Sequence, residues 1–320
     1  MSHFIFGGSG FIGTHLIALI DNLYPGTRIY NLDIVENNHE GKSTYINCDV
    51  RSEINIDIPV TSEDVIFNFA AVHRTPGHPD QAYFETNIRG AENVCAFAEK
   101  FGVKRIVFTS SIAPYGAAED LKTEKTLPTP NTPYGISKLV AEKIHAIWQA
   151  KKTNERQLTI VRPGVVFGKG ENGNFTRLYW GIRGGKFFYP GRKDTIKACI
   201  YVKELVRFML YRLENHSEGV ELYNCTFEPA FTIEQIVETM KKVTGLQRAI
   251  VKVPGSLLMT VASIVGPLGG KALGICPARV KKLMISTNIC GKKLADSGYK
   301  FHYTFEEAIK DWYRDNDNLY

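Results

Sequence analysis

Two side chains of one expected helix have the types and spacing to move a proton. Tyr134 and Lys138 are four residues apart, so they share a helix face. A neighbouring ammonium lowers the pKa of a phenol from about 10 toward neutrality, where it can exchange protons. Ser111 ends an expected buried strand and offers a partner hydroxyl. We therefore predict Ser111, Tyr134 and Lys138 as the catalytic group; a second copy of the spacing, Tyr189–Lys193, contains Pro-Gly and disfavours a helix.

A glycine loop near the N-terminus has the spacing of a dinucleotide site. Gly7, Gly10 and Gly13 stand between an expected strand and an expected helix. The first permits a tight turn, the second lets backbone approach a pyrophosphate, and the third lets the helix pack on the strand. Asp33 follows Gly13 by 20 residues, where a carboxylate accepts hydrogen bonds from a ribose diol and repels a 2′-phosphate. NAD is favoured as cofactor, and NADP stays open.

These residues require a sheet to position them, and the chain alternates strand and helix patterns. Such alternation predicts an α/β fold, a Rossmann-type doubly wound parallel sheet, with a smaller, mixed C-terminal substrate-binding region. We expect a NAD-binding domain over 1–168, rejoined by about 198–226, and a mainly substrate-binding region over 169–320. The expected strands are Ser2–Phe6, Arg28–Asp33, Tyr45–Cys48, Asp64–Phe69, Val103–Thr109 and Leu158–Val161. Three helices are expected: one that follows the glycine loop and ends near Leu23, one from about Asp80 to Phe101, and one over Tyr134–Lys151 with Thr132 as its N-cap.

Composition excludes several classes of protein. The 320 residues are 44% hydrophobic and 22% charged, as in ordinary globular proteins. The net charge of +6 comes with no basic tract, so we expect no nucleic-acid partner. The six cysteines form no C-x-x-C pair, and His73 and His78 have no third ligand nearby, so no metal is predicted. The apolar stretch Gly255–Gly270 is too short to span a membrane, and we expect a cytoplasmic protein with no membrane partner.

Several motifs together resemble the extended short-chain dehydrogenase/reductases, and more narrowly the NAD-dependent epimerase/dehydratase group, which modifies nucleotide sugars. The resemblance spans the whole chain and is strongest over 1–168. The motifs that carry it are Gly7-x-x-Gly10-x-x-Gly13, Asp33, Asn68-Phe69-Ala70-Ala71, Asn87, Thr109-Ser110-Ser111, Tyr115-Gly116, Tyr134-x-x-x-Lys138 and Arg162-Pro163-Gly164.

The resemblance implies roles for matching residues. Ser111 would hydrogen-bond the reacting sugar oxygen, Tyr134 would donate or remove its proton, and Lys138 would hold the nicotinamide ribose. His73 falls near the cofactor in relatives, although a loop histidine can also simply pack or face water. The resemblance also implies a homodimer through the helices at about 80–101 and 134–151. The implied cofactor residues are Gly7, Gly10, Phe11, Ile12, Gly13, Asp33, Asp49, Val50, Ala70, Ala71, His73, Asn87, Thr109, Tyr134, Lys138 and Pro163.

Departures from the family pattern narrow the reaction. Ile112-Ala113-Pro114, rather than an acid, follows Ser111, which disfavours dehydration. The stretches 173–178 and 186–189 look closer to reductases, so the main prediction is an NDP-4-keto-6-deoxyhexose 4-reductase. The alternative is an NDP-hexose 4-epimerase of the UDP-glucose or UDP-GlcNAc type with tightly bound NAD, which Asp33 favours. A hydroxysteroid-type dehydrogenase is a more distant alternative.

The second region supplies candidates for a nucleotide-diphosphate sugar. Asn174, Arg192 and Lys197 are predicted to contact diphosphate or sugar, since arginine and lysine suit phosphate. Phe188 and Tyr189 are predicted to contact the base. For each of them, solvated surface is the alternative interpretation.

Overall fold

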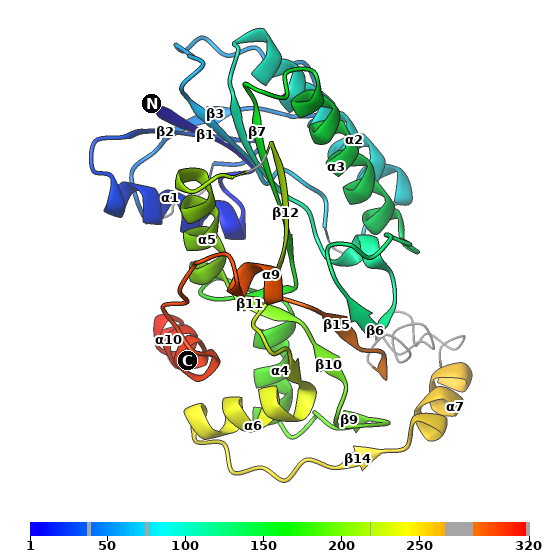
Figure 1. The fold of residues 1–320 in the computed structure, drawn as a ribbon. Helices are drawn as coiled ribbons and strands as arrows, with labels where there is room; N and C mark the ends of the chain where they lie inside the picture. Colours follow the sequence, from blue (N-terminus) through cyan, green and yellow to red (C-terminus); the bar gives the residue numbers. More distant parts are fainter. Residues whose placement is uncertain (37–39, 74–76, 218, 266–283, 318–320) are drawn as a thin grey trace.

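Seven parallel strands form the centre of the molecule (Figure 1). The structure, a computed structural model, describes residues 1–36, 40–73, 77–217, 219–265 and 284–317. The strand order is β12-β7-β5-β4-β1-β2-β3, with every neighbouring pair parallel. This confirms the predicted Rossmann-type sheet. Its strands are β1 (Ser2–Phe6), β2 (Arg28–Asp33), β3 (Thr44–Asn47), β4 (Val65–Asn68), β5 (Arg105–Thr109), β7 (Gln157–Pro163) and β12 (Val220–Cys225).

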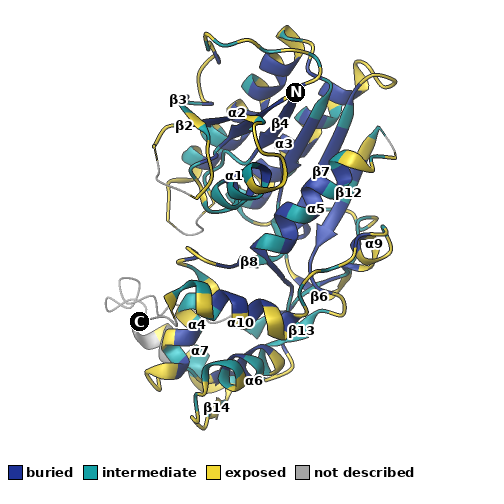
Figure 2. Cartoon of the chain, turned by 90° about the vertical axis from the view of Figure 1, so that its left-hand side faces the viewer, coloured by how far each residue is buried: buried dark blue, intermediate teal, exposed yellow. Residues whose placement is uncertain are grey.

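Helices cover both faces of this sheet, because its strands are apolar on both sides. Phe4 and Phe6 face α2 (Asp80–Lys100) and α3 (Pro133–Ala150), whereas Ile5 between them faces α1 (Phe11–Leu23) and α5 (Val202–Glu214). Alternate residues of one strand thus enter two separate cores. Figure 2 shows the strands buried between helices that are exposed only on their outer sides.

A second, smaller region is built on short strands. A mixed sheet has the order β13-β10-β15-β6, with β10 antiparallel to β13 and parallel to β15. The region's core is largely aromatic and includes Phe167, Tyr179 and Trp312. Its elements are η1 (Ala113–Tyr115), β6 (Ala118–Lys122), β8 (Val165–Phe167), α4 (Asn174–Arg183), β9 (Tyr189–Pro190), β10 (Ile196–Lys197), β11 (Cys199–Tyr201), β13 (Phe231–Thr232), α6 (Ile233–Thr244), β14 (Lys252–Val253), α7 (Gly255–Val265), β15 (Thr287–Ile289), α9 (Lys292–Ala295) and α10 (Phe305–Asp315).

The chain passes more than once between the two regions. β12, from the second half of the sequence, pairs with β7, while β6, from the first half, pairs with β15. The fully buried carboxylate of Glu204 on α5 accepts hydrogen bonds from the Tyr299 hydroxyl (2.5 Å) and the Tyr303 amide (2.7 Å). Segments distant in sequence therefore fix one region against the other. Within the described residues, no helix is long and apolar enough to cross a membrane.

Candidate active site

The glycine loop connects β1 to α1 at the carboxyl edge of the sheet. Gly7 has a φ of +78°, and a Cβ there would lie 2.6 Å from the backbone nitrogen of Ala70. A Cβ at Gly13 would lie 2.6 Å from the Gly7 carbonyl oxygen. Gly10 caps α1 without a side-chain hydrogen bond, and the first turn holds no acid. The amides of that turn, which include those of Phe11 and Ile12, are therefore suited to an anion.

The carboxylate of Asp33 lies against this loop. Its Oδ2 accepts a hydrogen bond from the Ser9 amide at 3.1 Å, and its Oδ1 accepts one from the Ile34 amide at 2.8 Å. The Asn31 side chain donates to the Ser9 hydroxyl at 3.0 Å. The end of β2 and the glycine loop thus form one surface, with the acid where a ribose diol would meet it.

The predicted Tyr134–Ser111 pair is brought together. Thr132 caps α3 by accepting a hydrogen bond from the Gly135 amide at 3.1 Å, as predicted, so Tyr134 lies in the first turn. The spacing predicted that Lys138 would lower the pKa of Tyr134, but burial raises it, and only a hydrogen bond with Ser111 opposes that rise. The Ser111 Oγ also accepts from the Ala113 amide at 3.1 Å. Two hydroxyls held in this way can bind one oxygen of a substrate and exchange a proton with it.

Lys138 lies one turn further along α3 and is only 2% exposed. Its Nζ is 4.5 Å from the centroid of the Phe108 ring. Burial lowers the pKa of Lys138 to about 7, and the nearby carboxylate of Glu142 acts in the opposite direction. A lysine with a pKa near neutrality can change its charge within the range in which enzymes work.

Glu142 is a residue of this site that the sequence analysis missed. It accepts hydrogen bonds from Arg162 at 2.8 and 2.6 Å and from the Ser110 hydroxyl at 2.5 Å. The Arg162 guanidinium lies over the ring of Tyr115, with 4.7 Å between its Cζ and the ring centroid. The pair thus ties α3 to β7 and to the residue before Ser111. Spacing could have revealed it, since Glu142 is four residues after Lys138 on the same helix face.

His145 is a second missed residue. Its ring is fully buried and stacks on Phe108 with 4.1 Å between the ring centroids. Nδ1 lies 2.8 Å from the Ala141 carbonyl oxygen, and Nε2 lies 3.2 Å from the side-chain Nδ2 of Asn68. Burial lowers the pKa of His145 to about 4, so the ring is neutral at pH 7. It acts as a support beneath Phe108, on whose ring Lys138 rests.

Two buried polar atoms at the carboxyl ends of β4 and β5 lack a partner among the described residues. They are Asn68 Oδ1 and Thr109 Oγ1. Buried polar groups are nearly always hydrogen-bonded in a complete structure, so such atoms at a strand edge fit a site that takes a ligand. With the glycine loop and Asp33, they make this edge chemically suited to a dinucleotide.

Residues 3–226 match the family model described as NAD dependent epimerase/dehydratase family. The match covers more than two thirds of the chain and ends one residue after β12. The chain belongs to this family. The resemblance inferred from the motifs is thereby confirmed.

The chain is similar to several named epimerases. The chain is 33% identical, over 95% of its own length and 92% of the relative's, to N-acetyl-alpha-D-glucosaminyl-diphospho-ditrans,octacis-undecaprenol 4-epimerase of Escherichia coli O157:H7. Its fold is similar to that of MoeE5 in complex with UDP-glucuronic acid and NAD (TM-score 0.77, 20% identity, 100% of both chains). It is also similar to UDP-N-acetylglucosamine 4-epimerase from Bacillus cereus (TM-score 0.72, 20% identity, 98% of both chains).

Other predicted cofactor residues of this family member lie around the same edge. The Asp49 carboxylate is held by Arg51 at 2.6 Å, which lowers its pKa. Val50 is buried, and a Cβ at Gly90 would lie 2.9 Å from its side chain, so α2 packs closely here. Asn87 accepts from the Val72 amide at 2.8 Å and donates to the Val72 carbonyl at 3.1 Å. The structure therefore places Asn87 as a clamp on the loop after β4.

The remaining cofactor predictions fall on loops at this edge. Ala70 and Ala71 are half-buried in the loop that Asn87 holds, and His73 beyond them is exposed. Pro163 is buried at the end of β7, where its carbonyl accepts the Ile112 amide at 3.2 Å. Pro163 thus holds the segment that follows Ser111. Direct cofactor contact by these residues stays a prediction.

The predicted substrate residues do not all lie together. Arg192 donates to the Ser286 hydroxyl at 3.0 Å, and Lys197 donates to the Ile285 carbonyl at 2.7 Å, so these two cations meet beside one segment. Asn174 is exposed at the start of α4, and Phe188 is 36% exposed. Tyr189 is only 1% exposed and packs in the aromatic core, because strand β9 turns its ring inward. Base contact by Tyr189 does not fit this burial.

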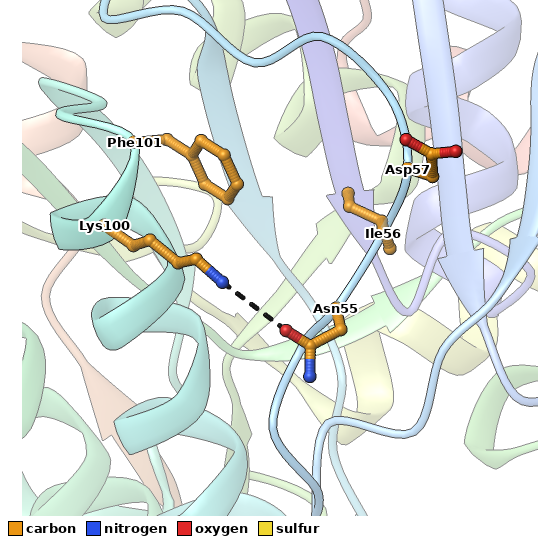
Figure 3. A pocket seen from close by; sticks show the side chains of 5 residues that line it. All are labelled: Asn55, Ile56, Asp57, Lys100 and Phe101. Carbon is orange, nitrogen blue, oxygen red and sulfur yellow. Dashed lines mark hydrogen bonds between the residues drawn. The ribbon is translucent and has the colours of Figure 1, made fainter.

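Figure 3 shows a surface pocket whose lining includes none of the predicted catalytic residues. It is lined by the end of α2 and the segment after β3, with Lys100 Nζ 3.4 Å from Asn55 Oδ1. Parallel strands begin at this edge of the sheet, since β5 starts at Arg105 shortly after α2 ends. Ligands of such sheets bind at the carboxyl edge, so this pocket is not part of the candidate site.

Proposed function

We propose that this chain is a NAD-dependent 4-epimerase that acts on an N-acetylhexosamine joined to a diphosphate. The observation that carries the proposal is the match to the E. coli undecaprenol-linked 4-epimerase along nearly the full length of both chains. This is the alternative of the sequence analysis, and it replaces the 4-ketoreductase as the favoured function. The relatives compared above give the reductase no comparable support.

The chain's own residues have distinct tasks in this reaction. The glycine loop and Asp33 bind the dinucleotide, and Lys138 orients its nicotinamide ribose. When bound, NAD supplies reversible hydride transfer at the sugar C4. Ser111 holds the C4 oxygen while Tyr134 takes its proton during oxidation and returns a proton during reduction. Inversion requires that both faces of the sugar ring be presented to the same pair of hydroxyls.

The diphosphate would be held in the second region. Arg192 and Lys197 are the candidate cations, although Glu119 (3.2 Å) and Asp194 (3.0 Å) already pair with Arg192. A diphosphate would compete with these carboxylates, and bidentate phosphate binding suits the guanidinium. A cytoplasmic location and a homodimer also remain predictions.

Cofactor retention tests the reaction type. The freshly purified protein is denatured, and the released dinucleotide is quantified. We expect nearly one NAD per chain, because an epimerase regenerates its oxidised cofactor in each cycle. Protein that is empty, and that reduces a 4-keto-6-deoxy nucleotide sugar only when NADH or NADPH is added, would establish the reductase instead.

Turnover without added cofactor is the second test. UDP-GlcNAc and a polyprenyl-diphosphate GlcNAc are each incubated with the protein, and the hexosamine is identified after acid release. We expect the C4 epimer, GalNAc, from at least one of them. Absence of the epimer from both would contradict the proposal.

A further inference from the structure

Helix α7 is apolar and makes few contacts with the rest of the described residues. Its sequence from Gly255 to Val265 contains no charged residue. It packs closely against no other helix or strand of the described residues, and it lies at the periphery of the second region (Figure 1). Leu257 is 55% exposed, and the preceding Val251 is 66% exposed. A helix of this composition normally buries its surface, so a partner should cover it.

The charge of the surrounding sequence indicates which partner. From Thr239 to Ala295 the chain contains ten Lys and Arg residues and no Asp or Glu. The rest of the chain holds 29 basic and 33 acidic residues, so the positive excess of the protein comes from this stretch. No run of basic residues marks it, which is why the sequence analysis judged the charge to be unclustered. Cations beside apolar side chains are typical of segments that lie on anionic lipid.

Two exposed cations, Arg248 and Lys252, lie on the segment that precedes α7 in the chain. Lys252 is exposed on β14, directly before α7. It pairs with Tyr189 on β9, so it lies near Phe188, the exposed residue that precedes Tyr189. Arg248 is exposed and close to the turn at Gly185, where a Cβ would lie 2.9 Å from its guanidinium. Neither cation forms an ion pair with a described carboxylate. We call Phe188, Arg248, Val251, Lys252 and Leu257 the α7 face.

The α7 face adjoins the residues proposed to hold the diphosphate. A Cβ at Gly255, the first residue of α7, would lie 2.8 Å from the Met284 sulfur. The next two residues after Met284, Ile285 and Ser286, accept hydrogen bonds from Lys197 and Arg192. The start of α7 therefore contacts the same short segment, 284–286, that Arg192 and Lys197 contact. A diphosphate held there could continue into a hydrocarbon chain on the apolar side.

We propose that the α7 face docks on the surface of an anionic lipid bilayer and that the sugar substrate is presented from that bilayer as a polyprenyl diphosphate. The second half of this statement rests on the proposed function. At 11 residues, or about 16 Å, α7 is too short to span a bilayer and would lie along its surface. The proposal departs from the expectation that the protein has no membrane partner.

Vesicle binding tests the docking surface independently of turnover. The full chain is sedimented with vesicles of phosphatidylcholine alone and with vesicles that also contain phosphatidylglycerol. We expect binding to the anionic vesicles that falls roughly tenfold in Leu257→Glu and in the double variant Arg248→Glu/Lys252→Glu. Leu23→Glu, on an exposed leucine at the far end of α1, is the matched control and should bind like the wild type. Failure to bind anionic vesicles, or equal binding by Leu257→Glu, would overturn the proposal.

Turnover then tests the origin of the substrate. Polyprenyl-diphosphate GlcNAc in anionic vesicles is compared with UDP-GlcNAc in solution. We expect Leu257→Glu to lose about tenfold in rate on the embedded substrate while Leu23→Glu loses nothing. Equal rates for wild type and Leu257→Glu on the embedded substrate would refute presentation from the bilayer. If neither substrate is epimerised, the proposed function fails, while the vesicle result still decides whether the α7 face binds lipid.

Discussion

The buried ammonium of Lys138 makes the stability of the protein depend on pH. Its ammonium rests on the Phe108 ring, close to a Glu142 carboxylate that Arg162 already neutralises. Burial therefore dominates and lowers the pKa of Lys138 to about 7. The ordinary lysine value is about 10.4, so the unfolded chain binds more protons between pH 7 and pH 10 than the folded one does. Stability thus rises with pH across this window, and the cost of the buried charge is fully present below pH 7.

Replacing Lys138 with Met should remove that cost. We expect Lys138→Met to stabilise the cofactor-stripped protein by roughly 1 to 3 kcal/mol at pH 7, with a gain that shrinks toward pH 10. The same change should abolish turnover. Urea unfolding at pH 7 and pH 9 measures the effect, and Lys143→Met, at an exposed position of the same helix, is the control. A Lys138→Met protein less stable than the wild type at pH 7 would refute this account.

Tyr134 is expected to contribute to chemistry and little to binding. Because its phenol is the proton donor and acceptor, Tyr134→Phe should lower the turnover rate by about 100- to 10,000-fold. Dinucleotide released on denaturation should stay near the wild-type amount. Tyr24→Phe, which removes a phenol at the end of α1, should leave both values unchanged. Activity in Tyr134→Phe equal to that of the wild type would exclude this residue from catalysis.

At the scale of elements, the glycine loop sets how closely β1, β4 and α1 approach one another. A methyl group at Gly13 would meet three backbone atoms of the loop at 2.6 Å, and none of them belongs to a flexible side chain. We expect Gly13→Ala to destabilise the fold by about 1 to 3 kcal/mol and to lose bound dinucleotide. Gly245 ends α6 with a φ of +73° in open space, so Gly245→Asn should be tolerated. Thermal unfolding and dinucleotide content measure both variants, and a Gly13→Ala protein that retains both would contradict the packing argument.

His145 connects three elements, because α3 carries it, β4 supplies Asn68 and β5 supplies Phe108. Its pKa is lowered to about 4, and so is that of His3 on β1. Between pH 4 and 6.5 the unfolded chain binds more protons than the folded one, so stability falls as the pH falls through this window. We expect His145→Gln to reduce that acid dependence by about a third to a half, since His3 and His15, whose pKa burial also lowers, contribute the rest. Unfolding midpoints from pH 4 to 7 measure it, and the exposed His78→Gln should leave the slope unchanged.

At the scale of the whole molecule, the sequence predicted the first region far better than the second. β2 has the predicted bounds, and α1 and α2 end within one residue of the expected positions. Long periodic patterns carry that information. Apart from β6, the second region has strands of two or three residues, such as β10, whose partners lie up to 90 residues away. No local pattern encodes such pairings.

Burial by distant partners also limited the prediction of the site. Glu142 on a helix would ordinarily face water, and only Arg162, 20 residues later, makes it an interior charge. Tyr189 is predicted to contact the base because it is an aromatic residue of the second region, but its ring is buried in the core. The choice between reductase and epimerase depends on how firmly the cofactor is retained. Asp33 favours tightly bound NAD, whereas the stretches 173–178 and 186–189 favour a reductase, so the motifs did not decide between the two reactions.

The outer surface of α3 is unusually apolar. Ile136, Val140 and Ile147 are 40%, 36% and 60% exposed. Their spacing places them on one side of the helix, which fits the dimer implied by the family resemblance. We expect a dimer in sedimentation velocity and expect Ile147→Glu to shift it to monomer. Leu127→Glu, at a 79% exposed loop position, should remain dimeric; a wild-type protein that is monomeric at every concentration would contradict the prediction.

The return of the chain to complete the sheet at β12 determines where the gene can be cut. A fragment ending at Gly168 would include the glycine loop, Ser111, Tyr134 and Lys138, yet β7 would become an unprotected edge strand. Leu158, Ile160 and Val161 on that strand are nearly fully buried in the intact protein. Long apolar edges recruit other chains, so such a fragment should aggregate although it contains every predicted catalytic residue. The shortest independently expressible piece would have to extend past Cys225.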